Sequence, residues 1–411
     1  MKSMVKISRF AVLSLSLLIP SLASAQHYIQ TNLVSDLAAD APNRDPNLRN
    51  PWGLSRSTTS PWWVSDNNSG LNNTPGFATL YSITGAITPK ITLAATTSML
   101  VVTIPPPKGS NAPATPTGTV FNGSTDFAVA PGKPALFLFV TEDGTISGWN
   151  PGVDATHAIL KVPVDNPPSG AVYKGVTTAD VDGVRYLYVA NFNSGHIEVY
   201  DTNFKLVKFS TDKDDRDRDD HDRFNDGDRH DRHSEGSFDD DAIPRGFAPF
   251  NVQNIGGSLF VTYAKQDEAR HDDVAGAGNG YVDIYTPTGK LERRLEHGPW
   301  LNSPWGVVWA PRDFGEFSNR VLVGNFGSGQ IAAYDGFSGK FVGLLKTYTD
   351  PVNLTGEHVL TIEKLWAIAF GNSANAGPYN ALFFTAGPND ESDGIFGALT
   401  AVAGEQDGDE E

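Results

Sequence analysis

Short stretches of alternating apolar and polar residues recur along the chain, separated by segments rich in Gly, Pro, Asn and Asp. The stretches YVANFNSGHIEVYD (188–201) and LVGNFGSGQIAAYD (322–335) share eight of fourteen residues. In both, a tight turn containing glycine joins two alternating runs, which is the pattern of a β-hairpin. Weaker copies bring the number of predicted hairpins to six, at 62–82, 137–150, 259–286 and 382–399.

A short apolar run precedes each predicted hairpin, and a more polar segment such as GKLERRLEHG (289–298) follows. The apolar runs begin near Asn50, Ser124, Tyr173, Pro244, Ser303 and Leu365. Their Gly and Pro residues suit buried inner strands that crowd together near an axis. Six units of four strands predict an all-β fold, a six-bladed β-propeller. No segment sustains a helical period, so helical repeats are excluded, and an array of β-sandwiches is the alternative.

The segment 27–36 is predicted to be a lone strand that precedes the first inner strand. In a propeller it would supply the outermost strand of the last blade, beside the hairpin at 382–399. This arrangement closes the ring and removes an open sheet edge.

Residues 1–25 read as a signal peptide, with Lys2, Lys6 and Arg9 before a short apolar segment and an Ala-Ser-Ala site at 23–25. Cleavage would leave a mature chain starting at Gln26, and an uncleaved anchor is the alternative. We therefore expect a secreted protein, periplasmic or extracellular. The propeller is assigned to 26–402 and an acidic tail to 403–411, whose sequence favours release over anchoring.

Residues 211–241 contain fourteen acids, six bases and three histidines, so they cannot build a core and are predicted to form a disordered insertion between blades 3 and 4. We expect deletion of 212–240 to leave the thermal midpoint nearly unchanged. An EF-hand is excluded, because with Gly227 at loop position 6 the ligand positions 3 and 12 would hold Phe224 and His233. A diffuse cation-binding tract, or a metal site at His221, His230 and His233, is the alternative to a solvated tether.

The formal charge of −17 makes nucleic acid and anionic lipid unsuitable partners. The absence of cysteine from the whole chain excludes disulfides and cysteine-ligated metals. Motifs for serine hydrolases, zinc proteases and P-loop enzymes are also absent from the sequence. These observations leave small molecules, cations and proteins as partners, and we expect a monomer.

Ligand sites of propellers lie at one mouth of the central channel, where inner strands begin and hairpin turns gather. Four residues near the predicted starts of inner strands are candidate ligand-binding residues: Asn50, Asp126, Lys174 and Arg245. Lys174 and Arg245 suit an anionic group, or each pairs with nearby acids.

Hairpin turns at the same mouth offer oxygen ligands for a hard cation such as Ca²⁺. The candidate metal ligands are Asp66, Glu142, Asn191 and Asn325. The turns at 265–280 and 387–394 carry further candidates, namely Asp267, Glu268, His271, Asp272, Asp273, Asp390, Glu391 and Asp393. The alternative is that Asn and Asp only close their own turns. Trp52, Trp305 and Trp366 fall at matching places in three repeats and are interpreted as packing residues.

The repeat resembles NHL-type six-bladed propellers. The phrases TNLVSDLAADAPNRDPNLRNPWGLS, GFAPFNVQNIGG, LNSPWGVVWAP, LVGNFGSGQI and LWAIAFGN are similar to an uncharacterised family of secreted bacterial six-bladed propellers. The resemblance implies this fold and an exported location. It implies no established activity. The alternative function comes from the acids and amides at the channel mouth, because six-bladed lactonases and related hydrolases hold a metal with carboxylates and asparagines.

Two function classes therefore remain. The first is a secreted binding or scaffold protein that presents a site for a small molecule or protein at its channel mouth. The second is an extracellular calcium-dependent hydrolase or lactonase. The sequence leaves open whether the protein is an enzyme.

Overall fold

The computed structural model describes residues 27–67, 75–83, 101–162, 170–209 and 238–402. Within these ranges the chain forms strands β1 to β29 and a single short 3-10 helix, η1 (Gly315–Phe317). No helix among these residues has the length and hydropathy that a membrane span requires.

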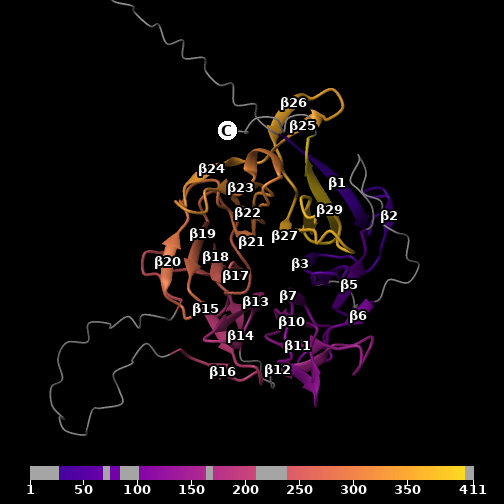
Figure 1. Ribbon diagram of the computed structural model, residues 1–411, viewed down its shortest axis with the longest axis vertical. Helices are drawn as coiled ribbons and strands as arrows, with labels where there is room; N and C mark the ends of the chain where they lie inside the picture. The colour runs from indigo at the N-terminus through magenta and orange to yellow at the C-terminus, as the bar shows by residue number, and fades with distance from the viewer. Residues whose placement is uncertain (1–26, 68–74, 84–100, 163–169, 210–237, 403–411) are drawn as a thin grey trace, which may run out of the picture.

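Six small, mainly antiparallel sheets surround one axis, as Figure 1 shows, so the chain is a six-bladed β-propeller as the repeats predicted. Blade 1 consists of β3 (Pro51–Ser55), β4 (Trp62–Asp66), β5 (Phe77–Tyr81) and β6 (Val101–Thr103). Blade 2 consists of β7 (Pro116–Phe121), β10 (Phe137–Thr141), β11 (Ile146–Trp149) and β12 (Ile159–Val162). Blade 3 consists of β13 (Tyr173–Val181), β14 (Val184–Asn191), β15 (His196–Tyr200) and β16 (Leu206–Val207). Blade 4 consists of β17 (Phe247–Ile255), β18 (Ser258–Lys265), β19 (Gly280–Tyr285) and β20 (Leu291–Arg294). Blade 5 consists of β21 (Pro304–Trp309), β22 (Val321–Asn325), β23 (Ile331–Tyr334) and β24 (Phe341–Leu344).

Blade 6 combines the two ends of the described chain. Its inner strands β27 (Leu365–Phe370), β28 (Leu382–Ala386) and β29 (Ile395–Ala401) are followed by β1 (Tyr28–Ser35), which pairs antiparallel with β29. The predicted ring closure by the N-terminal strand is therefore confirmed. The short strand β2 (Asn43–Arg44) runs parallel to β1 and covers its outer edge, so that β1 does not form the edge of the sheet.

Two small hairpins form two-stranded sheets outside the six blade sheets. The hairpin of β25 (Lys346–Asp350) and β26 (Thr355–Val359) lies between blades 5 and 6 and contacts His27, whose ring stacks on Tyr348 at 3.8 Å. The hairpin of β8 (Ala128–Ala130) and β9 (Lys133–Pro134) belongs to blade 2.

The inner strand of blade 2 differs from the prediction. The sequence placed it in the run that begins at Ser124, but the inner strand is β7, and that run forms β8. The apolar alternation of the run misled the prediction, whereas β7 carries Thr117, Gly118 and Thr119. These residues fit the crowded axis because Gly118 has backbone of blade 3 within 3 Å of where a Cβ would lie.

Every inner strand has a register shift near its start, and each shift places an extra residue toward the axis. We call the six residues at these shifts the bulge ring: Trp52, Thr117, Lys174, Phe250, Trp305 and Trp366. A small residue follows in most blades. A Cβ at Gly53 would lie 2.5 Å from the carbonyl oxygen of Thr117, so only glycine lets blades 1 and 2 approach this closely.

Aromatic side chains of the bulge ring fill the channel. Trp366 stacks on Trp52, with ring centroids 3.5 Å apart, and on Phe326 at 3.9 Å, while Trp305 meets both tryptophans edge-on. The tryptophans therefore pack as interpreted from the sequence, but against one another across the axis. Separate apolar clusters fill the spaces between neighbouring blades.

Residues 1–25, the tail 403–411 and most of the predicted insertion lie outside the described residues. The final part of the insertion, however, belongs to the fold. Phe238 is buried against Tyr188 and Tyr285, and Asp240 forms an ion pair with Arg294. The expectation of a harmless 212–240 deletion is therefore corrected, because that deletion would remove both contacts.

Candidate functional site

Lys174 is the one charged member of the bulge ring, and it is buried at the channel mouth. The register shift in β13 turns its side chain toward the axis, where 1% of it is exposed. Its ammonium lies 4.9 Å from the ring centre of Trp52 and 5.7 Å from that of Phe192. Aromatic faces attract a cation at such distances. The aromatic side chains that fill the channel, here called the aromatic plug, therefore form an apolar surface that still stabilises the charge of the lysine.

Two carboxylates hold the Lys174 ammonium. Its Nζ donates to Glu142 Oε1 at 2.5 Å and to Asp272 Oδ1 at 3.3 Å. Burial by itself lowers the pKa of Lys174, but the attraction of Glu142 and Asp272 outweighs it and raises the pKa above its ordinary value. The lysine is therefore a fixed positive charge.

Glu142 comes from the tight turn between β10 and β11 and is nearly as buried as its partner. Its second oxygen, Oε2, accepts a hydrogen bond of 2.9 Å from Asn67 of blade 1. Its backbone N–H donates to the carbonyl oxygen of Thr115. The carboxylate is thus held between three blades with both oxygens bound.

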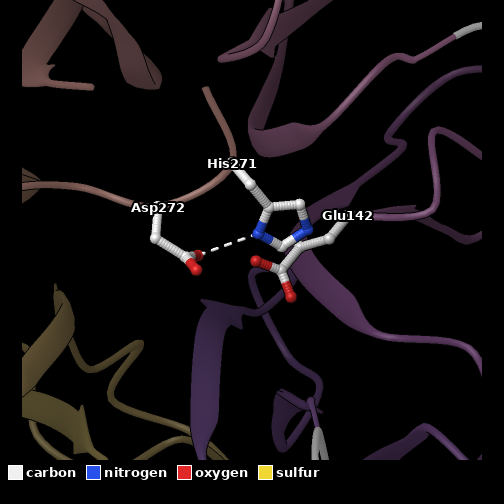
Figure 2. Close-up of side chains that lie close together, drawn as sticks. All are labelled: Glu142, His271 and Asp272. Atoms are coloured by element: carbon white, nitrogen blue, oxygen red, sulfur yellow. Dashed lines mark hydrogen bonds and ion pairs between the residues drawn. The ribbon is translucent and has the colours of Figure 1, made fainter. Parts of the chain in front are cut away.

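His271 and Asp272 reach the same place from the long loop between β18 and β19. Asp267 fastens this loop, because its Oδ1 accepts the backbone N–H of His271 at 2.9 Å. Figure 2 shows His271 Nδ1 directed at Asp272 Oδ1, 3.0 Å away, with Glu142 beside the ring. This bond to His271, with help from Lys174, lowers the pKa of Asp272 to about 2, and the same bond raises the pKa of His271.

Blade 6 supplies the opposite wall. Glu391 Oε2 accepts a 3.0 Å hydrogen bond from Asn50, and Asn50 Oδ1 in turn accepts one from the Trp366 indole. Lys364 Nζ lies 3.7 Å from Glu391 Oε1 and 4.6 Å from the ring centre of Phe326. Burial raises the pKa of Glu391 to about 7, although Lys364 and Asn50 both act to lower it.

The backbone around this wall is strained. Asn389, Asp390 and Glu391 have consecutive positive φ angles of 55°, 54° and 65°. Residues other than glycine adopt this region at a cost, and such strain is concentrated at functional sites in proteins. Asn50 and Lys364, each directly before an inner strand, also have positive φ.

These side chains border two cavities that meet at Glu142 and His271. The mouth cavity has a volume of about 590 Å³ and is lined by side chains from Trp52, Glu142, Lys174, Asp272, Lys364 and Glu391, among others. A neighbouring cavity of about 420 Å³ extends from the same Glu142 and His271 toward Lys108 and Asn193. A ligand in the mouth cavity would meet several carboxyl groups, Glu142 and Glu391 among them, and the two lysines.

Two of the four predicted ligand-binding residues lie at the mouth cavity and two do not. Lys174 lies in the mouth cavity, and Asn50 lies behind it, bound to Glu391. Asp126 was expected at the start of an inner strand, but it follows the end of β7, whose beginning marks the mouth. The misassigned inner strand of blade 2 caused this error. Arg245 is exposed and lies five residues before Phe250, the bulge-ring residue of blade 4, whereas Lys174 is itself the bulge-ring residue of blade 3.

The four predicted metal ligands have separate surroundings. Asn191 Oδ1 accepts the backbone N–H groups of Val172 and Ser194, and Asn325 Oδ1 accepts that of Asn302. The Ser194 bond, and a bond that Asn325 Nδ2 donates to the carbonyl oxygen of Gln330, close the two local turns, which was the alternative interpretation. Only Glu142 belongs to the group of His, Asp and Glu atoms that the described residues bring within 4.8 Å of one another, together with His271 and Asp272.

Asp66, the remaining predicted ligand, is fully buried in blade 1, where its Oδ2 accepts the backbone N–H of Thr79. Burial raises the pKa of Asp66 well above its ordinary value, and the nearby Asp45 adds to the rise. Because the folded state binds the proton more tightly, wild-type stability falls as pH rises from about 4 toward the folded pKa.

We therefore expect Asp66→Asn to remove this loss. Below about pH 4 the variant should match the wild type, and above it should gain up to about 1.4 kcal/mol of unfolding free energy per pH unit relative to the wild type. Chemical denaturation across pH 4 to 8, with exposed Asp40→Asn as the control, measures the difference. A variant that is less stable than the wild type throughout would show that Asp66 is ionised in the fold.

Lys364 is the site residue that sequence reasoning missed. It occupies the same position before β27 that Asn50 occupies before β3, so alignment of the repeats could have identified it. His271, Asp272 and Glu391 were recognised as turn residues, but not as partners of Lys174 and Asn50.

Comparison with known proteins places the chain among viral relatives. No family model matches the sequence. The chain is 28% identical over 372 residues to uncharacterized protein L690 of Acanthamoeba polyphaga mimivirus, covering 89% of this chain and 84% of the relative. These relatives give no support to the bacterial source that the resemblance implied. Among solved structures, virginiamycin B lyase from Staphylococcus aureus is similar in fold, with a TM-score of 0.44 and 11% identity over 91% of this chain and 99% of the lyase.

A second relative is closer in sequence. Uncharacterized protein R648 of the same mimivirus is 30% identical over 373 residues, which cover 89% of this chain and 78% of R648. At this identity and coverage, the chain belongs to the family of R648.

Proposed function

We propose that this protein binds a small polar ligand in the mouth cavity of its propeller. The observation that carries the proposal is that all six blades contribute to one cavity of about 590 Å³. Trp52, Glu142, Lys174, Asp272, Phe326 and Lys364 come from blades 1 to 6 in that order. A concave site with a few convergent charged groups above an apolar floor is typical of small-molecule sites.

The walls indicate the chemistry of the ligand. Glu142 and Lys174 largely neutralise each other, whereas Asp390 has 95% of its side chain exposed and Asp272 has 67%. Lys364 is 29% exposed and can donate to an acceptor in the cavity. A ligand carrying a cationic or hydroxyl-rich part for the acids and an acceptor for Lys364 fits these groups. Export by the N-terminal leader would expose this site to extracellular or periplasmic solutes.

A thermal-shift screen tests this proposal with polar metabolites, including amines, sugars and amino acids, on the full chain. We expect at least one compound to raise the melting temperature, because a ligand that binds only the native state stabilises it. Lys364→Ala should abolish that shift. The matched control is Lys340→Ala, since Lys340 is 72% exposed on blade 5 beside Glu296. If no compound shifts the wild type, or if Lys364→Ala leaves every shift intact, the mouth cavity is not a ligand site.

A hydrolytic function is the second candidate, and Glu391 favours it. This residue lines the same cavity as Glu142, which is paired with Lys174. With a pKa raised to about 7 by burial, Glu391 can hold or release a proton near neutral pH, while Glu142 stays paired. A panel of lactones and esters, assayed with and without chelator, tests this function. Turnover that Glu391→Gln abolishes would support it, and a uniformly inactive panel would favour the binding function.

A further inference from the structure

Glu142, His271 and Asp272 form a donor set that neither function described above requires. One donor atom from each lies within 4.8 Å of the other two. Glu142 is buried and fixed by Asn67, while His271 and Asp272 are exposed at 46% and 67% of their side chains. Figure 2 shows the three side chains converging from two different loops. One rigid and two adjustable ligands can close around an ion without rearranging the blades.

The position already attracts a cation. The Lys174 ammonium bonds to both carboxylates of the set, at 2.5 and 3.3 Å. Two carboxylates share this single ammonium, and the same cavity is bordered by Asp273, Asp390 and Glu391 with one further base, Lys364, so its acids outnumber its lysines. The local charge therefore favours a further positive ion, and an ion that binds Asp272 competes with Lys174 for it.

Access and open coordination positions come from the cavities. Glu142 and His271 line both the mouth cavity and its neighbour, so a hydrated ion can reach them from either side. Three protein ligands leave at least one position for water, as in catalytic zinc sites. One imidazole and two carboxylates suit Zn²⁺ and similar transition metals, whereas Ca²⁺ prefers oxygen ligands alone.

We propose that Glu142, His271 and Asp272 bind a divalent transition-metal ion, with Zn²⁺ as the test ion. This site differs in residues and in ion from the calcium set expected from the sequence. It does not depend on the organic ligand proposed above, because binding of the ion alone is measured.

The test is calorimetric titration of the full chain with Zn²⁺ at about pH 8, chosen because metal binding competes with protons for the ligands, followed by elemental analysis after dialysis. The variants are His271→Ala and Asp272→Asn. The matched control is His157→Ala, because His157 makes a similar contact with Asp154, at 3.3 Å, without a third ligand. The histidines at 221, 230 and 233 are present in every variant and contribute equally.

We expect the wild type and His157→Ala to bind one more Zn²⁺ than His271→Ala. Asp272→Asn should weaken that site about tenfold or more, because it removes a ligand that also orients His271. Equal stoichiometry and affinity in the wild type, His157→Ala and His271→Ala would overturn the proposal and assign any bound zinc to other histidines. Circular dichroism of each variant confirms that the fold is retained.

Discussion

Replacing Lys174 with methionine is expected to lower the free energy of unfolding by about 3–5 kcal/mol, the range observed when one partner of a buried ion pair is removed. Lys174 is 1% exposed and Glu142 is 8% exposed. Without the ammonium, the Glu142 carboxylate would stay buried with Asn67 as its remaining side-chain hydrogen-bond donor. The loss comes mainly from this uncompensated charge, because methionine fills a similar volume.

A double-mutant cycle separates the charge from the packing. Adding Glu142→Gln to Lys174→Met removes the stranded charge, so the double variant should recover much of the lost stability in urea denaturation. Lys364→Met is the matched control: this lysine also lies over an aromatic ring and near acids, but it is 29% exposed. Lys364→Met should lower the free energy of unfolding by about 1 kcal/mol or less. A Lys174 effect as small as that of Lys364 would contradict the buried-pair interpretation.

Trp366→Ala is expected to lower the free energy of unfolding by about 3–5 kcal/mol, because it removes a large buried ring and leaves a cavity that the rigid blades cannot fill. Trp366 is 1% exposed, stacks on Trp52 and Phe326, and donates its indole N–H to Asn50. The substitution therefore also removes the indole donor to Asn50 Oδ1, and Asn50 holds Glu391. We expect the variant to affect the mouth cavity as well as stability.

The comparison for Trp366 is Trp309, a half-buried tryptophan at the end of β21 whose ring meets Phe337 edge-on. Trp309→Ala should lower the free energy of unfolding by about 1–2 kcal/mol, because the side chain is partly open to solvent and its removal leaves a smaller cavity. Equal losses for both variants in thermal and urea unfolding would show that the aromatic plug contributes no more than surface packing does.

The hairpins were predictable because strand periodicity and turn chemistry are local properties. The motif at 188–201 folds as β14 and β15, and its copy at 322–335 folds as β22 and β23. The N-terminal strand was also predictable, since a ring of sheets must cover its edges. Blade 2 was not fully predictable, because its inner strand β7 is selected by close approach of neighbouring blades and not by apolar alternation.

The candidate site was predictable only in part. Lys174 and Glu142 were identified because inner strands and tight turns gather at one mouth. Asn191 and Asn325 were chosen by the same reasoning, yet their amides bond to the backbone of their own turns, at Ser194 and Gln330. Sequence position shows which loop a side chain occupies, but its orientation depends on local hydrogen bonds that compete with the channel.

The sequence alone determined the repeat, the strand order of every blade except the second, and the mouth at which polar turns collect, because these follow from patterns within each blade. The tertiary structure decided which of those polar residues meet. The pairing of Lys174 with Glu142 and Asp272 joins blades 2, 3 and 4, and that of Asn50 with Glu391 joins blades 1 and 6. Such contacts depend on the angle between blades and on the register shift in each inner strand, and these arise only when six sheets pack around one axis.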